Sequence, residues 1–139
     1  MFLDKCLGRY DVANALRAAG ARVEVHHDHF DQDAEDAVWL PSVGAKGWIV
    51  LSKDRHFRHN YLELVAMFRG NVRAFVLSAT DMTGSGMAQA FVAALPHILS
   101  FASKFDPPFV AHITATSNVK MAWHKSQLYR SFSDRTPRK

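Results

Sequence analysis

Acidic side chains stand at three positions of this sequence from which they could share one metal ion. Asp4 follows a short apolar pair, and Asp54 closely follows a longer apolar run. A third acid, Asp36 or Glu35, stands near the beginning of a predicted helix. Carboxylates that lie together repel one another, and a hard divalent cation such as Mg²⁺ or Mn²⁺, which prefers oxygen ligands, offsets that repulsion. Such a cation activates water and neutralises charge on a phosphoryl group, so the pattern predicts nuclease or phosphatase chemistry.

Short apolar strands that alternate with amphipathic helices are predicted to bring these acids together. Residues 48–51 form an apolar run preceded by Gly47, which is typical of a buried strand. The alternation predicts an α/β fold in three layers, with a mostly parallel sheet covered by helices on both faces. The carboxyl ends of such strands face the ligand crevice, so we expect all three acids at that edge. Asp54 also has a purely structural interpretation, because Asp is a preferred cap for the helix that follows.

The element boundaries follow from the spacing of apolar residues and from glycine and proline. The predicted strands cover residues 2–4, 21–26, 48–51, 72–77 and 109–113. The predicted helices cover residues 10–19, 34–45, 58–68 and 83–105, with Asp33 as the cap of the second. A proline within a helix removes a backbone hydrogen bond, so we expect a kink or a restart at Pro41 and a perturbation at Pro96.

Length and composition predict one domain with a sizeable core, since the chain has 139 residues of which 48% are hydrophobic. No apolar run approaches the ~20 residues that cross a bilayer, and the start lacks the pattern of a secretion signal. Cys6 is the single cysteine, which excludes an internal disulfide and a thiolate metal cage. We therefore expect a cytoplasmic protein that does not contact a membrane.

Basic residues crowd into the end of the chain, whose formal net charge is +4. The last twenty residues contain the following cations, opposed there by Asp134: Lys120, Lys125, Arg130, Arg135, Arg138 and Lys139. We expect a domain of residues 1–114 followed by a basic tail of residues 115–139, of which residues 120–139 are expected to be mobile. Aromatic and apolar side chains are interleaved with the charges, so the tail suits single-stranded RNA, a partner protein or weak packing on the body.

Histidines and carboxylates also gather between residues 26 and 33, in the order His-His-Asp-His-Phe-Asp-Gln-Asp. Neutral imidazole and carboxylate suit zinc, iron or manganese. In a strand, however, His27 and His29 would point to one side while His26 and Asp28 point to the other, so that at most a pair would converge. The segment is a metal site, a polar loop at the end of a strand, or a surface whose histidines titrate near neutral pH.

Other hydrolase and nucleotide-binding patterns are missing from the sequence. No G-x-S-x-G elbow occurs, which argues against a Ser/His/Asp triad. The chain has neither G-x-x-x-x-G-K-[ST] nor G-x-G-x-x-G, and Gly84-Ser85-Gly86 is too short a match to indicate a phosphate-binding loop. Metal-dependent chemistry is therefore the interpretation that the residues favour.

Three short motifs in the same order resemble those of PIN-like domains of the VapC-like toxin group. That family has an F-L-D-x-x-L-G opening, a D-x-x-W-L helix start and a V-V-L-T-K-D strand end. Residues 2–8 here are F-L-D-K-C-L-G, residues 36–40 are D-A-V-W-L, and residues 49–54 are I-V-L-S-K-D. The strand at 72–77 is also similar, so the resemblance covers about residues 2 to 113.

This resemblance implies a metal-dependent endoribonuclease, the toxin component of a toxin-antitoxin pair, that cleaves RNA phosphodiesters with metal-activated water. Asp4, Asp36 and Asp54 would hold Mg²⁺ or Mn²⁺, and the Ser52 hydroxyl would support them as a fourth catalytic group. Glu35 would replace Asp36 if the alignment shifts by one residue.

The chain departs from the family pattern at two places. Cys6 stands where a polar residue such as Asn is commoner, and a thiol would not make the same hydrogen bond. The family often carries a fourth acid, for which Asp81 is the candidate.

Basic residues beside the proposed ligands would hold the phosphates of RNA without reading its sequence. These residues are Lys5, Arg9, Lys53, Arg55 and Arg58. The expected partners are therefore RNA and an antitoxin protein, and a homodimer is left open. The alternative function is a non-catalytic PIN-like module that binds RNA or a partner protein.

Overall fold

The computed structural model of this chain describes residues 1–8, 10–53, 61–78 and 82–124. The helices are the 3-10 helix η1 (Lys5–Leu7), α1 (Asp11–Ala18), α2 (His26–His29), α3 (Asp36–Ala45), α4 (Tyr61–Gly70) and α5 (Gly84–Lys104). The strands are β1 (Phe2–Leu3), β2 (Glu24–Val25), β3 (Ile49–Ser52), β4 (Arg73–Leu77), β5 (Phe109–Ile113) and β6 (Val119–Trp123).

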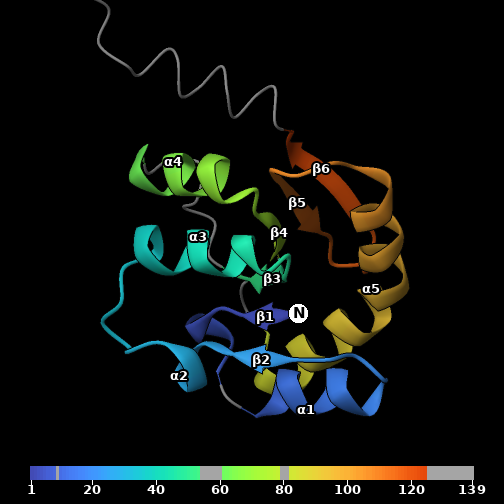
Figure 1. Cartoon of the computed structure of the whole chain (residues 1–139). Helices are drawn as coiled ribbons and strands as arrows, with labels where there is room; N and C mark the ends of the chain where they lie inside the picture. The colour runs from blue at the N-terminus through green and yellow to red at the C-terminus, as the bar shows by residue number, and fades with distance from the viewer. Residues whose placement is uncertain (9, 54–60, 79–81, 125–139) are drawn as a thin grey trace, which may run out of the picture.

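The six strands form one mostly parallel sheet in the order β2-β1-β3-β4-β5-β6 (Figure 1). Every neighbouring pair is parallel except β5 and β6, which are antiparallel. Parallel neighbours need a crossover, and the helices between successive strands supply it. The predicted α/β fold is confirmed.

Helices cover both faces of this sheet and divide the core in two. The helices α1 and α5 pack together on one face, and α3 and α4 pack together on the other. Successive side chains of a strand point to opposite faces. In β1, Leu3 accordingly joins the core beneath α1 and α5, while Phe2 joins the core beneath α3 and α4. Strands buried on both faces have nearly continuous apolar sequences, which is why the sequence revealed them.

Helix α5 is long and apolar enough, by length and composition, to cross a membrane. In this fold it packs on the sheet, and its buried side chains include Phe91, Leu95 and Ile98. It begins near the predicted position, and its first turn is capped because the Thr83 hydroxyl accepts a hydrogen bond from the Gly86 N–H at 3.0 Å.

The helices α3 and α4 approach each other backbone to backbone. A Cβ atom added to Gly44 would overlap the carbonyl oxygen of Gly70, and one added to Gly70 would lie 2.8 Å from the Cα of Pro41. Helix α3 continues through Pro41 without the restart that the sequence suggested. This close packing fixes α3, whose first residue is Asp36, against the rest of the domain.

The end of the described chain differs from the expected tail. Val119–Trp123 forms β6, an edge strand joined to β5 by a turn in which Ser117 has a φ of 63°. Side chains of β6 reach both cores, because Met121 packs in the core beneath α1 and α5 while Trp123 packs in the core beneath α3 and α4. The pairing of β6 with β5 has a register shift between Val110 and Ala111. The expectation of a mobile segment is therefore wrong for residues 120–123, which belong to β6. The apolar residues of this strand are interrupted by Lys120, so its sequence pattern is weak. Residues 125–139 lie outside the described part of the chain.

Candidate active site

The carboxylate of Asp4 lies at the carboxyl edge of the sheet, where the central strands end. Asp4 extends the pairing of β1, because its N–H donates to the Leu51 carbonyl at 2.9 Å. Only 3% of Asp4 is exposed. A buried carboxylate costs free energy unless polar groups stabilise it, so this acid is placed by the fold and is not a surface charge.

Ser52 supplies one such group from the neighbouring strand. It is the last residue of β3, fully buried, and its hydroxyl donates to Oδ2 of Asp4 at 2.9 Å. The parallel register, which pairs Leu3 with Leu51, sets the two side chains next to each other. Ser52 therefore contacts Asp4 directly, and its catalytic role stays a prediction.

Cys6 adjoins the same pair from the short helix η1. Its Sγ atom lies 3.5 Å from the Ser52 hydroxyl oxygen, and the side chain is partly buried. The thiol thus contacts the hydroxyl that serves Asp4, at the position where the sequence departs from the family.

Of the other two predicted ligands, the structure describes only the backbone of Asp36. Helix α3 begins at Asp36, and Glu35 precedes it with an extended backbone (φ −69°, ψ 146°) and no side-chain cap bond. The Asp36 side chain lies outside what the structure describes, and so does all of Asp54. The expected cap, Asp33, is wrong because the helix begins three residues after it. The convergence of three carboxylates stays a prediction.

The described donors at this edge suit a hard divalent cation. Asp4 and Ser52 offer carboxylate and hydroxyl oxygens, the chemistry that Mg²⁺ and Mn²⁺ prefer. Among the side chains that the structure describes, no group of three His, Cys, Asp or Glu could hold a metal. The oxygens present fit such an ion, and a complete site needs ligands beyond this pair.

The basic residues expected to hold RNA have different positions. The Lys5 ammonium donates to the Gln32 carbonyl at 2.7 Å, which ties η1 to the loop before α3. Lys53 follows β3 and is partly buried. The remaining predicted contacts, Arg9, Arg55 and Arg58, lie outside the described residues, as does the candidate fourth acid Asp81.

The histidine-rich segment is a short helix, α2, and not the end of a strand. Its His29 ring bonds the Glu24 carboxylate at 2.8 Å. That hydrogen bond is the main cause lowering the pKa of Glu24. His27 is exposed and His26 is buried. The side chains therefore diverge, and within the described chain they form no metal site.

His26 was considered in the sequence only as a member of the histidine-rich segment, and not as a neighbour of Asp4. It follows β2 as Asp4 follows β1, in a register that pairs Val25 with Leu3. Only 1% of it is exposed. The signal in the sequence was the polar residue directly after an apolar strand, the same signal that identified Asp4.

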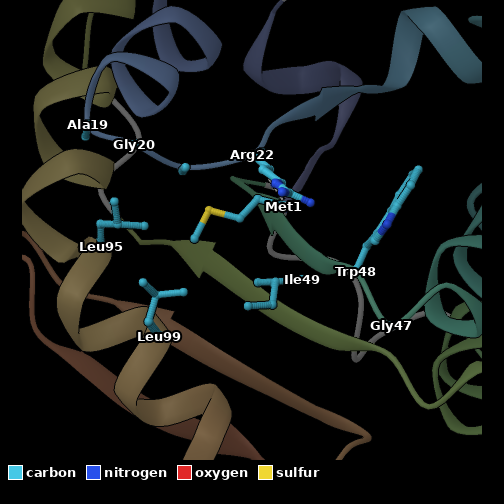
Figure 2. Close-up of a pocket in the computed structure, with 10 residues that line it drawn as sticks. Met1, Ala19, Gly20, Arg22, Gly47, Trp48, Ile49, Leu95 and Leu99 are labelled. Carbon is cyan, nitrogen blue, oxygen red and sulfur yellow. Dashed lines mark hydrogen bonds between the residues drawn. The ribbon is translucent and has the colours of Figure 1, made fainter.

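A cavity of about 370 Å³ lies at the opposite edge of the sheet, where the strands begin (Figure 2). Trp48 and Ile49 line it beside β3, Leu95 and Leu99 line it from α5, and Met1 and Arg22 complete one side. The lining contains no carboxylate, so the metal chemistry expected from the sequence does not belong there.

Comparison with known proteins identifies similar chains. The family described as "PIN like domain" matches residues 1–79, which is more than half of the chain. A curated protein of Mycobacterium tuberculosis named "Putative ribonuclease VapC45" is 27% identical over 125 residues, which cover 87% of this chain and 90% of that protein. No solved structure matches the chain.

Proposed function

This chain belongs to the PIN-like domain family, as its motifs predicted, and on that premise we propose that it is a metal-dependent endoribonuclease. The observation that carries the proposal is the buried Asp4 carboxylate, held by the Ser52 hydroxyl at the carboxyl edge of the sheet. The name of the similar protein from Mycobacterium tuberculosis also supports ribonuclease activity. The substrate in this proposal is single-stranded RNA, and the bond cleaved is its phosphodiester.

Three acids would hold the ion in this proposal: Asp4 at the end of β1, Asp36 at the start of α3, and Asp54 two residues after β3. Bound Mg²⁺ or Mn²⁺ supplies charge neutralisation at the phosphate and a reactive water. Ser52 fixes the orientation of the Asp4 carboxylate through the 2.9 Å hydrogen bond, so that an oxygen of Asp4 is held ready for the ion.

Basic side chains around this edge would bind the RNA backbone. Lys53 stands between Ser52 and Asp54 in the sequence, and Arg9, Arg55 and Arg58 are proposed with it. Lys5 has a second role, because its ammonium already holds the Gln32 carbonyl. Contacts of this kind position a strand without reading its sequence.

We place the protein in a toxin-antitoxin pair, in the cytoplasm, with an antitoxin protein as its partner. The similarity to the VapC45 protein along 87% of this chain supports this biological class. A small antitoxin-like reading frame beside the gene would support it independently. A homodimer is a further assembly to test by the mass of the protein in solution.

Metal binding gives the first test. Added Mn²⁺ is expected to raise the unfolding temperature of the wild type more than that of Asp54→Asn, because an ion that binds only the folded protein stabilises it by linkage. Without metal, the variant should unfold at an equal or higher temperature, since one of several clustered negative charges is removed. The measurement is a thermal melt of each protein with and without Mn²⁺.

Equal Mn²⁺-induced shifts in both proteins would remove Asp54 from the ligand set. The wild type should also cleave single-stranded RNA in Mn²⁺ and stop when a chelator is added. RNA binding that is indifferent to chelator, without cleavage, would instead identify a non-catalytic RNA-binding module. Turnover of a generic phosphomonoester would point to a phosphatase.

A further inference from the structure

We propose that His26 is a positioning residue whose ring packs on the first turn of α3 while its nitrogen atoms serve the polar groups at the end of β1, and so sets Asp4 relative to Asp36. This inference rests on the proposed function and adds a residue to it. His26 lies in neither the predicted ligand set nor the predicted RNA contacts.

Asp4 and Ser52 lie on the face of the sheet that α3 and α4 cover. Phe2 and Val50 pack in the core beneath α3 and α4. Side chains two residues apart in a strand point to the same face. Asp4 and Ser52 each stand two residues further along, so they face α3 as well.

His26 occupies the same face on the other side of Asp4. Its ring centroid lies 6.1 Å from that of Phe2, and the register of β2 and β1 brings His26 beside Asp4 at the carboxyl edge. Asp4 therefore stands between Ser52, the last residue of β3, and His26, which directly follows β2.

The His26 ring contacts helix α3 through Trp39. The His26 ring meets the Trp39 ring edge to face, with centroids 5.5 Å apart and planes at 88°. Trp39 is fully buried and lies three residues after Asp36, in the first turn of the helix. Residues three apart on a helix are neighbours on its surface. His26 thus contacts the turn of α3 that carries Asp36.

The His26 side chain differs from an apolar ring of similar shape by its two nitrogen atoms. The ring contacts of His26 with Phe2, Phe30 and Trp39 are ones that a phenylalanine would make equally well. Burying a polar ring costs more than burying an apolar one. A histidine at this position is explained if its nitrogen atoms serve the polar groups at the edge of the sheet.

Two substitutions separate packing from polar function. His26→Phe keeps the ring and removes the nitrogen atoms, so the metal-free protein should unfold at an equal or higher temperature. Its Mn²⁺ affinity should fall about 10–100-fold, the range typical of groups that orient metal ligands. His26→Gln keeps a polar group but loses ring packing, so it should lower the unfolding temperature and retain more of the Mn²⁺ affinity than His26→Phe.

The two variants are thus expected to change stability and Mn²⁺ affinity in opposite orders. A purely structural role of His26 would lower both quantities together. The matched control is His27→Phe, which changes the exposed neighbour in the same short helix and should leave Mn²⁺ affinity unchanged. Retention of wild-type Mn²⁺ affinity in His26→Phe would overturn the proposal. The proposal would also be overturned if, in both His26 variants, the Mn²⁺ affinity fell only in proportion to the loss of stability.

Alkylation of Cys6 gives a readout that does not depend on metal. Cys6 is the single cysteine, and its Sγ atom lies 3.5 Å from the hydroxyl that holds Asp4. If His26 fixes this edge, His26→Phe should speed the reaction of Cys6 with iodoacetamide in the metal-free protein, and His27→Phe should not. A wild type that shows no response to Mn²⁺ would contradict the proposed function, and an unchanged alkylation rate in His26→Phe would then overturn the positioning role separately.

Discussion

Replacing Asp4 by asparagine is expected to abolish RNA cleavage while the fold survives. Asparagine has nearly the same size, and its side-chain carbonyl can still accept the hydrogen bond from Ser52. It lacks the negative charge that attracts the ion. A catalytic metal contributes several kcal/mol to stabilising the transition state, and each ~1.4 kcal/mol is tenfold in rate. The rate of cleavage at saturating RNA should therefore fall at least about a hundredfold in Mn²⁺.

The control for this substitution is Asp28→Asn, which removes the same charge from an exposed position in α2. It should cleave RNA at the wild-type rate. Without metal, Asp4→Asn should unfold at a temperature equal to or above that of the wild type, because a buried charge has been removed. Full cleavage by Asp4→Asn would exclude the acid from the site, and a large loss of stability would show that the carboxylate has a structural role.

The placement of Asp4 and Ser52 could be predicted from the sequence because it depends on a local rule. A polar residue that follows a buried parallel strand must lie at the carboxyl edge, whichever strands turn out to be neighbours. The contact between the two residues depends on the pairing of β1 with β3, a long-range fact that the sequence did not reveal. The family resemblance implied only that Ser52 supports the metal ligands. His26 obeys the same rule, but the polar residues that follow it hid it in the pattern of a loop or metal site.

The misassigned parts of the fold have a common physical cause. The short helix α2 and the edge strand β6 are each stabilised by tertiary packing more than by their own sequence. His26 is buried against Trp39, and Trp123 joins the core beneath α3 and α4. The long helix α5, by contrast, has a sustained apolar period and a Thr83 cap, both of which are visible in the sequence.

Replacing Gly44 by alanine is expected to destabilise the domain, although alanine normally favours a helix by about 1 kcal/mol over glycine. The added methyl group would overlap the carbonyl oxygen of Gly70 and lie 3.0 Å from a methyl of Val72. The first obstacle is backbone, which cannot rotate away, so α3 and α4 must separate. Overpacking costs about 1–3 kcal/mol, and the upper end of that range predicts an unfolding temperature roughly 10 °C lower.

Gly86→Ala is the matched control, because it is the same substitution in the first turn of α5. There the nearest atom to an added methyl group is the Thr83 hydroxyl oxygen at 3.4 Å, so the alanine fits and stability should stay equal or rise. A thermal melt of both variants decides the point, and an equal or higher unfolding temperature for Gly44→Ala would contradict the backbone contact. Since α3 begins at Asp36, a displaced α3 in Gly44→Ala should also weaken Mn²⁺ binding, whereas Gly86→Ala should bind Mn²⁺ as the wild type does.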